Sequence, residues 1–148
     1  MRTRVENRFL RTRVMLADTL EKLGRLAECA RELAIIDETL ATRPSTPSIS
    51  RARATQVRAK LLIAQNGFER AVALLKQAAE EAVAVEGPQS SAAIDIRLLL
   101  ARLFLLRFLP EEANAAKEAA LAALRSTGGA ALVKAALAES QLTMNAYE

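Results

Sequence analysis

The chain has 148 residues, about the length of one domain, and 51% of them are hydrophobic, which is enough to build a buried core. One cysteine and no histidine exclude an internal disulfide and the common transition-metal sites. The net charge of +4 arises in residues 1–13, which hold five arginines and one glutamate, whereas the rest of the chain has 16 basic and 16 acidic residues. With only 3% aromatic residues and abundant alanine, the composition favours closely packed helices over a sheet.

Helices and turns alternate from the N-terminus onward. The predicted helices span about 4–23, 25–41, 49–65, 68–85, 91–108 and 110–126, with a terminal helix at about 129–146. Gly24, Asn66-Gly67 and Leu109-Pro110 form short breaks between the two helices of a pair. The longer breaks between pairs contain Pro44 and Pro47, then Gly87-Pro88, then Gly128-Gly129.

Small residues recur at one interval in these pairs. Cys29, Ala71 and Ala113 are 42 positions apart, and the two kinds of break follow the same period. We therefore predict a single all-α domain, with units of about 1–43, 44–86 and 87–127 followed by the terminal helix. The expected fold is a right-handed α-α superhelix of three helical hairpins plus a C-terminal helix. A seven-helix up-and-down bundle is the alternative, since it would show the same amphipathic stripes.

Two of the turns carry a family resemblance. The segment Gly67-Phe68-Glu69-Arg70-Ala71 resembles the opening of the second helix of a tetratricopeptide repeat (TPR), and 24–29 is a second copy with Cys29 in the alanine position. The unit of 42 residues is longer than the usual 34 by about one helical turn in each helix. Unit two, at 59–75, also resembles the sensor superhelix of MalT-like regulators in the LuxR superfamily. That resemblance implies a sensor domain that binds an inducer or an inhibitory protein, and nothing in the chain resembles the family's nucleotide-binding or DNA-reading parts.

Repeat superhelices of this type bind along the surface formed by the first helix of each unit. The repeat pattern places the following residues there: Arg11, Val14, Asp18, Lys22, Arg53, Gln56, Lys60, Ile63, Asp95, Leu98, Arg102 and Leu105. The candidate groove consists mainly of the members from units two and three, namely Arg53, Gln56, Lys60, Leu98, Arg102 and Leu105. Its arginines and lysine suit a carboxylate or phosphate of a ligand. The alternative is that these cations are solvated and pair with nearby acids.

The helix expected at 91–108 is apolar over an unusually wide arc. Either neighbouring helices bury it on both sides, or part of it forms a surface for dimerisation or an effector. The N-terminal stripe of Arg4, Arg8 and Arg11 suits phosphates, but the chain has few aromatics for base stacking. We expect that stripe to be solvated or to dock against an acidic neighbour, and we expect no direct nucleic-acid binding.

These patterns predict a non-catalytic protein. The chain lacks histidine, Cys29 occupies a packing position, and no phosphate-binding glycine loop or spaced carboxylate pair is present. We expect no cofactor. The predicted function is a ligand- or protein-binding sensor domain of a bacterial transcriptional regulator, and the alternative is a freestanding helical adaptor that dimerises or docks a peptide.

The sequence also predicts where the protein is found. The five arginines at the N-terminus leave no apolar core for a signal peptide. The most apolar stretch, 98–109, contains Arg102 and Arg107 and is shorter than the roughly 20 residues that span a bilayer. We therefore expect a soluble cytoplasmic protein with no membrane partner.

Overall fold

A computed structural model describes residues 2–42 and 48–126, with side chains from position 8 to position 125. This part of the chain is all-α, with six helices and no strand. The helices are α1 (Arg2–Lys22), α2 (Leu26–Ala41), α3 (Ile49–Ala64), α4 (Phe68–Glu86), α5 (Ser91–Leu106) and α6 (Pro110–Ser126). The predicted bounds are confirmed to within two residues. The terminal helix expected at 129–146 and the break at Pro44 and Pro47 lie outside the described residues.

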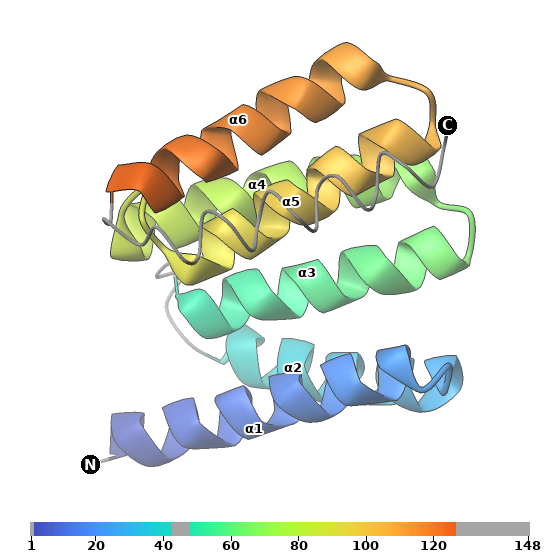
Figure 1. Cartoon of the computed structure of the whole chain (residues 1–148). Coiled ribbons are helices and arrows are strands. Elements are labelled where there is room, and N and C mark those ends of the chain that lie inside the picture. The colour runs from blue at the N-terminus through green and yellow to red at the C-terminus, as the bar shows by residue number, and fades with distance from the viewer. Residues whose placement is uncertain (1, 43–47, 127–148) are drawn as a thin grey trace.

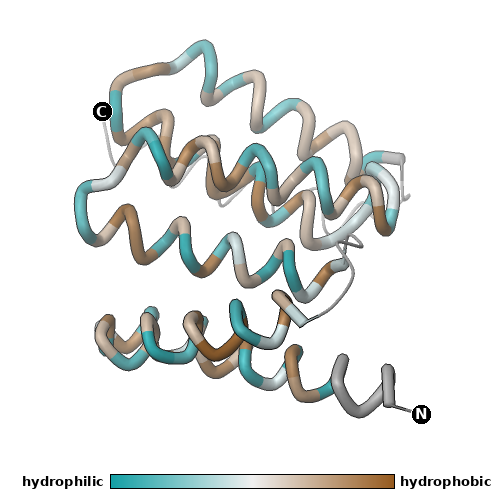
Figure 2. The backbone as a smooth tube through the Cα atoms, turned by 180° about the vertical axis from the view of Figure 1, so that it is seen from behind, coloured by the Kyte–Doolittle hydropathy of each residue, from teal (hydrophilic) through white to brown (hydrophobic). Residues whose placement is uncertain are grey.

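The helices pack as three hairpins, α1 with α2, α3 with α4, and α5 with α6 (Figure 1). The first helices are neighbours, since α3 contacts both α1 and α5, while α2 packs against α3 and α4 against α5. The three tight turns lie on one edge of the molecule, on the right in Figure 1. Hydrophobic and hydrophilic residues alternate along the helices with the period of amphipathic helices (Figure 2). The chain is therefore built from three similar helical pairs.

The tight turns repeat at the interval of 42 residues. Gly24, Asn66 and Phe108 each have a positive φ, of 75°, 64° and 57°. Glycine and asparagine adopt this left-handed conformation readily, but a bulky residue such as phenylalanine is strained in it. Phe108 also ends α5 two residues earlier than its apolar sequence predicts, and its side chain is 84% exposed.

Two helix starts repeat at the same interval. Ser48 and Ser90 precede α3 and α5, and each hydroxyl oxygen accepts a hydrogen bond from a backbone N–H three residues later, at 3.1 Å from Arg51 and 3.3 Å from Ala93. Such N-caps satisfy a donor that the helix itself leaves unpaired. The caps fix the axial position at which the first helix of units two and three begins.

The small residues are buried in core clusters to which both helices of their hairpin contribute. Cys29 and Ala71 are fully buried, and Ala113 is 3% exposed. Burial raises the pKa of the Cys29 thiol, and the nearby carboxylates of Glu21 and Asp18 raise it further. The thiol is therefore protonated at neutral pH, consistent with a packing role.

The wide apolar arc of α5 is mostly covered by protein. Its buried side chains contact α4 on one side and α6 on the other, in clusters that include Ile96 with Leu75 and Ile94 with Leu121. The exposed apolar residues lie at the C-terminal end of the helix and in the turn that follows: Leu106, Phe108 and Leu109. Burial by neighbouring helices thus accounts for the arc except at this end.

Replacing Ala71 by leucine should lower the free energy of unfolding by about 1–3 kcal/mol, because three added carbon atoms have no room between α3 and α4. The measurement is urea denaturation followed by circular dichroism. Ala73→Leu, at an exposed position of the same helix, is the control and should change stability little. A tolerated Ala71→Leu would show that the hairpin is not closely packed at this position.

Phe108→Asn should raise the free energy of unfolding by about 0.5–1 kcal/mol, because asparagine tolerates a left-handed backbone and the exposed ring contributes little burial. Asn66, at the same point of unit two, shows that the turn accepts this residue. A fall in stability on urea denaturation would mean that the Phe108 ring makes contacts worth more than the backbone strain.

Candidate functional site

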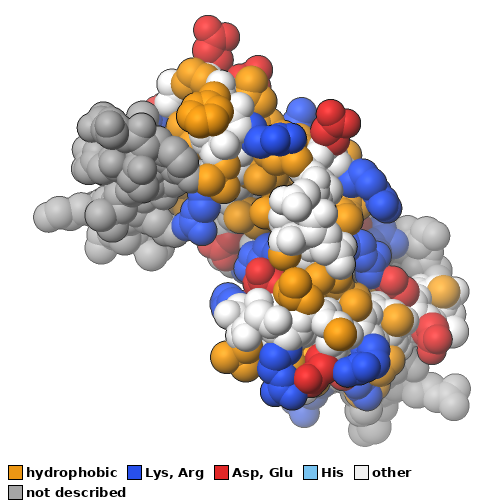
Figure 3. Space-filling model, turned by 90° about the vertical axis from the view of Figure 1, so that its right-hand side faces the viewer, with side chains coloured by type: hydrophobic (Ala, Val, Ile, Leu, Met, Phe, Trp, Pro, Cys, Tyr) orange, Lys and Arg blue, Asp and Glu red, His pale blue; other side chains and the backbone are white. Residues whose placement is uncertain are grey.

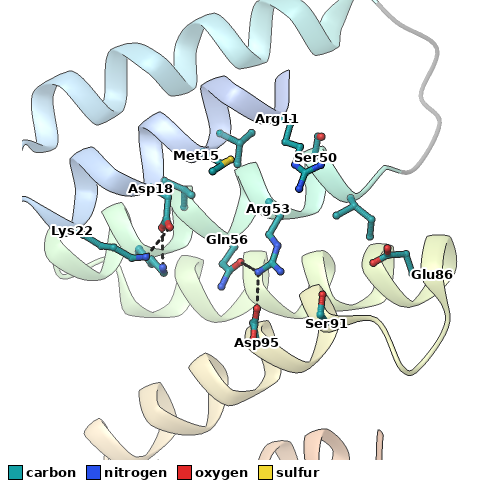
Figure 4. A pocket seen from close by; sticks show the side chains of 14 residues that line it. Arg11, Met15, Asp18, Lys22, Ser50, Arg53, Gln56, Glu86, Ser91 and Asp95 are labelled. Atoms are coloured by element: carbon teal, nitrogen blue, oxygen red, sulfur yellow. Dashed lines mark hydrogen bonds and ion pairs between the residues drawn. The ribbon is translucent and has the colours of Figure 1, made fainter. Parts of the chain in front are cut away.

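The first helices of the three units line a groove of about 760 Å³ (Figure 4). Eight of the twelve residues predicted for this surface line it: Arg11, Val14, Asp18, Lys22, Arg53, Gln56, Lys60 and Asp95. The prediction that α1, α3 and α5 share one hollowed surface is therefore consistent with the structure. The edge that carries the turns mixes charged and hydrophobic side chains, with hydrophobic ones gathered in the upper part of the view (Figure 3).

Two ion pairs cross the groove between adjacent units. Lys60 Nζ lies 3.0 Å from Asp18 Oδ1, and Arg53 Nη1 lies 2.9 Å from Asp95 Oδ2. The partners of each pair are 42 residues apart, so each pair joins equivalent helices of neighbouring units. Two of the predicted cations, Arg53 and Lys60, are thus paired with acids, as the alternative interpretation of these residues requires.

A buried glutamine lies between the two ion pairs. Gln56 is 8% exposed, and its Oε1 accepts a hydrogen bond of 3.2 Å from Arg53 Nη1. No described residue accepts a hydrogen bond from its amide nitrogen. The equivalent positions in the other units hold apolar Val14 and Leu98. Gln56 is therefore a polar group at a position where the repeat otherwise places a hydrocarbon.

Of the predicted residues of unit three, Asp95 lines the main groove, and Leu98 and Arg102 lie beside it. A hollow of about 170 Å³ has Leu98 and Arg102 among its lining residues, and one of about 330 Å³ has Ile63 and Arg102. Leu105 lines none of these three hollows. It is half-buried against the core cluster shared by α3, α4, α5 and α6, because it lies in the last turn of α5, where the chain packs against the next helix.

Six further residues line the groove that the sequence pattern did not indicate: Met15, Ile49, Ser50, Val57, Glu86 and Ser91. Part of this set follows from the repeat, since Met15 and Val57, and likewise Ile49 and Ser91, are 42 positions apart. Applying the interval to every position of the first helices would have found both pairs. Glu86 belongs to a second helix, so only the folded chain brings it to the groove.

Charge in the groove is mixed. Its lining has four cations, Arg11, Lys22, Arg53 and Lys60, and three carboxylates, Asp18, Glu86 and Asp95. No described residue pairs with the Arg11 guanidinium, which lies beside Ser50 at the end of the groove where α3 begins (Figure 4). This leaves one cation at that end available to a ligand.

The pKa of Asp18 lies below its ordinary value. Burial by itself raises this pKa, but hydrogen bonds and charge attraction from Lys60 and Lys22 lower it by more. Lys22 Nζ lies 3.0 Å from the second carboxylate oxygen of Asp18. The carboxylate is therefore held in its charged form between two helices.

In the described part of the chain, no three acidic or cysteine side chains are close enough to share a metal ion. None of the six described helices combines the length and apolar character needed to cross a bilayer. The arrangement is suited to holding a ligand by hydrogen bonds and charge.

Comparison with known protein families, with curated proteins and with solved structures gave no match.

Asp18→Asn should lower the free energy of unfolding at neutral pH by less than about 1 kcal/mol, since the ion pair is partly exposed. Because the folded pKa lies below 3.8, the contribution of Asp18 is present above that pH and is lost as the pH falls through the folded pKa. The stability difference between the two proteins should therefore shrink below about pH 3.8, as urea denaturation at several pH values would show.

Lys60→Met provides the control for this measurement, because it removes the partner that lowers the pKa most. In the Lys60→Met background, Asp18→Asn should have a smaller effect at neutral pH. An undiminished effect would assign the stabilisation to some other contact of Asp18.

Proposed function

We propose that this chain is a TPR-like helical-repeat binding domain whose groove on α1, α3 and α5 holds an extended segment of a partner polypeptide. The observation that carries the proposal is Gln56, a nearly buried side chain that lines the groove and whose amide nitrogen donates to no described residue. A buried donor without a partner costs about 1–3 kcal/mol, so its retention in place of a hydrocarbon favours a ligand that accepts from it.

The lining of the groove favours a polypeptide over a small apolar effector. Ten of its fourteen residues are charged or polar, whereas small-molecule sites are mostly apolar. A peptide backbone offers a carbonyl oxygen to the Gln56 amide, and an acidic side chain would suit Arg11. The ion pairs on both sides of Gln56 would position the segment and remain paired with each other.

The inter-unit ion pairs provide a way for binding to act on the rest of the domain. Asp18–Lys60 and Arg53–Asp95 join the first helices across the same groove that the segment would occupy. A ligand that contacts Arg53 or Lys60 competes with these pairs or adds to them. Binding would therefore favour one relative placement of the units, and so one curvature of the proposed superhelix.

The resemblance of unit two to MalT-like sensor superhelices supports a role for this binding in a regulator. In that setting the domain senses a partner protein or effector and passes the change in curvature to attached domains of a bacterial transcription factor. The recurrence of left-handed turns, small buried residues and ion pairs at 42 residues supports the repeat architecture on which the resemblance depends.

The second candidate function is a freestanding adaptor. The exposed apolar residues at the end of α5 favour it: Leu106 is 42% exposed, Leu109 37% and Phe108 84%. Residues of this kind beside a strained turn suit association with another protein. A dimer held by this edge, with no peptide in the groove, would favour the adaptor over the sensor.

Gln56→Leu should abolish most of the groove's binding while keeping the fold. Peptides would first be selected on the intact chain from a display library of random sequences and their dissociation constants measured by fluorescence anisotropy. Loss of one hydrogen bond donated from a buried amide should weaken binding about tenfold. Stability should be unchanged or raised, because leucine occupies the same position in unit three as Leu98.

The matched control is Gln77→Leu, the same chemical change at an exposed position of α4. It should leave peptide binding unchanged. Selected peptides that bind Gln56→Leu as tightly as the unchanged chain would contradict the proposed role of the amide, and a library that yields no binding peptide would contradict the peptide-binding function.

A further inference from the structure

The outer face of α1, which points away from the groove, is equivalent to a face that is buried in unit three. On α5 the five residues of this face are at most 5% exposed and pack toward α4: Ala92, Ala93, Ile96, Leu100 and Leu103. Two repeat intervals earlier, the equivalent residues of α1 are all exposed: Arg8, Phe9, Thr12, Leu16 and Thr19. In the repeat, this face of a first helix is therefore where the second helix of the preceding unit packs, and no described helix covers it on α1.

The exposed face keeps an apolar stripe. Phe9 and Leu16 are each 44% exposed, and Leu23, a further seven residues on, is 64% exposed. Residues seven apart lie on nearly the same side of a helix, so Phe9 and Leu16 form one line. Leu23 directly follows the last residue of α1, and its backbone N–H still donates to Thr19 O, so it continues this line. Leu16 lies about 200° around the helix from Asp18, so the stripe is separate from the groove.

In unit two, the equivalent face of α3 is covered by α2, and the charges of these two helices show what kind of helix this face binds. Arg58 of α3, one interval after Leu16, pairs with Asp37 of α2 at 2.7 Å. The segment 26–41 that forms α2 carries four acidic residues and one arginine beside its apolar stripe. A basic first helix is thus covered by an acidic amphipathic one.

Charge around the stripe on α1 has the same sign as on α3. Residues 1–13 hold five arginines against one glutamate, and Arg8, which belongs to this face, is exposed. Arg13 lies 4.9 Å from the centre of the Phe9 ring and pairs with Glu32 of α2 at 2.8 Å, so its charge borders the stripe. An occupant with carboxylates along its edges would neutralise these cations while its apolar side covers Phe9 and Leu16.

We propose that the outer face of α1 is a docking site for an acidic amphipathic helix of a partner, which packs on Phe9, Leu16 and Leu23 as α2 packs on α3. The site would extend the array by one helix at its N-terminal end. It is independent of the groove, so a protein can hold a groove ligand and a docked helix together.

The test uses a fluorescein-labelled peptide with the sequence of residues 26–41, with Cys29→Ala to prevent disulfide exchange. Its anisotropy is titrated with the full 148-residue chain. We expect saturable binding that weakens with added salt and weakens at least about tenfold when the acidic residues of the peptide are changed to their amides.

Leu16→Gln in the protein should weaken binding about tenfold, because it places an amide in the centre of the apolar stripe. Val85→Gln is the matched control, since Val85 is 43% exposed on α4, and it should bind as the unchanged chain does. Circular dichroism melts of both variants establish that each is folded, so a loss of binding reports on the face and not on the fold.

Three results would overturn the proposal. No binding of the peptide would remove the site, and equal binding to Leu16→Gln would mean that the peptide replaces the chain's own α2 or binds elsewhere. A dimeric mass by light scattering that becomes monomeric in Leu16→Gln would assign this face to a second copy of the chain. Binding of the groove peptides is unaffected in each case, so failure here is distinct from failure of the proposed function.

Discussion

The structure depends on the close approach of two helices in each hairpin, which only a small residue permits. Cys29, Ala71 and Ala113 occupy this crossing and are almost completely buried. Because a larger side chain would push the helices apart, the crossing fixes how far along its axis each second helix lies against the first. The left-handed turn at Gly24, Asn66 or Phe108 then closes the hairpin at a constant distance from the crossing.

This constant register accounts for the groove. Once the hairpins are alike and stack side by side, positions 42 apart on the first helices lie next to each other, which brings Asp18 to Lys60 and Arg53 to Asp95. Partly exposed pairs of this kind add little to stability. Their main effect is to neutralise Arg53 and Lys60. Among the described residues of the groove, the amide nitrogen of Gln56 and the guanidinium of Arg11 then remain available to a ligand.

Departures from the repeat are more informative here than the repeat itself. Gln56 replaces a hydrocarbon within the groove, Phe108 replaces glycine or asparagine in a turn, and Phe9 and Leu16 are exposed where their equivalents in unit three are buried. Each exception costs free energy, through an unpaired donor, a strained backbone or an apolar surface in water. At each of these positions the repeat offers a residue that would cost less free energy. The costly residue is therefore a candidate for contact with a ligand or partner.

The amino-acid sequence by itself determined the helices, the turns, the interval of 42 and eight of the residues that line the groove, because amphipathic period and turn residues are local signals. Only the tertiary structure decided that Arg53 and Lys60 are paired, that no described residue accepts from the Gln56 amide nitrogen and that Leu105 packs half-buried against the core. Those outcomes depend on the rotation and axial offset of each helix against its neighbours, to within a few ångströms. Such offsets are set by side-chain packing between units and by the N-caps at Ser48 and Ser90, which no periodicity within a single helix encodes.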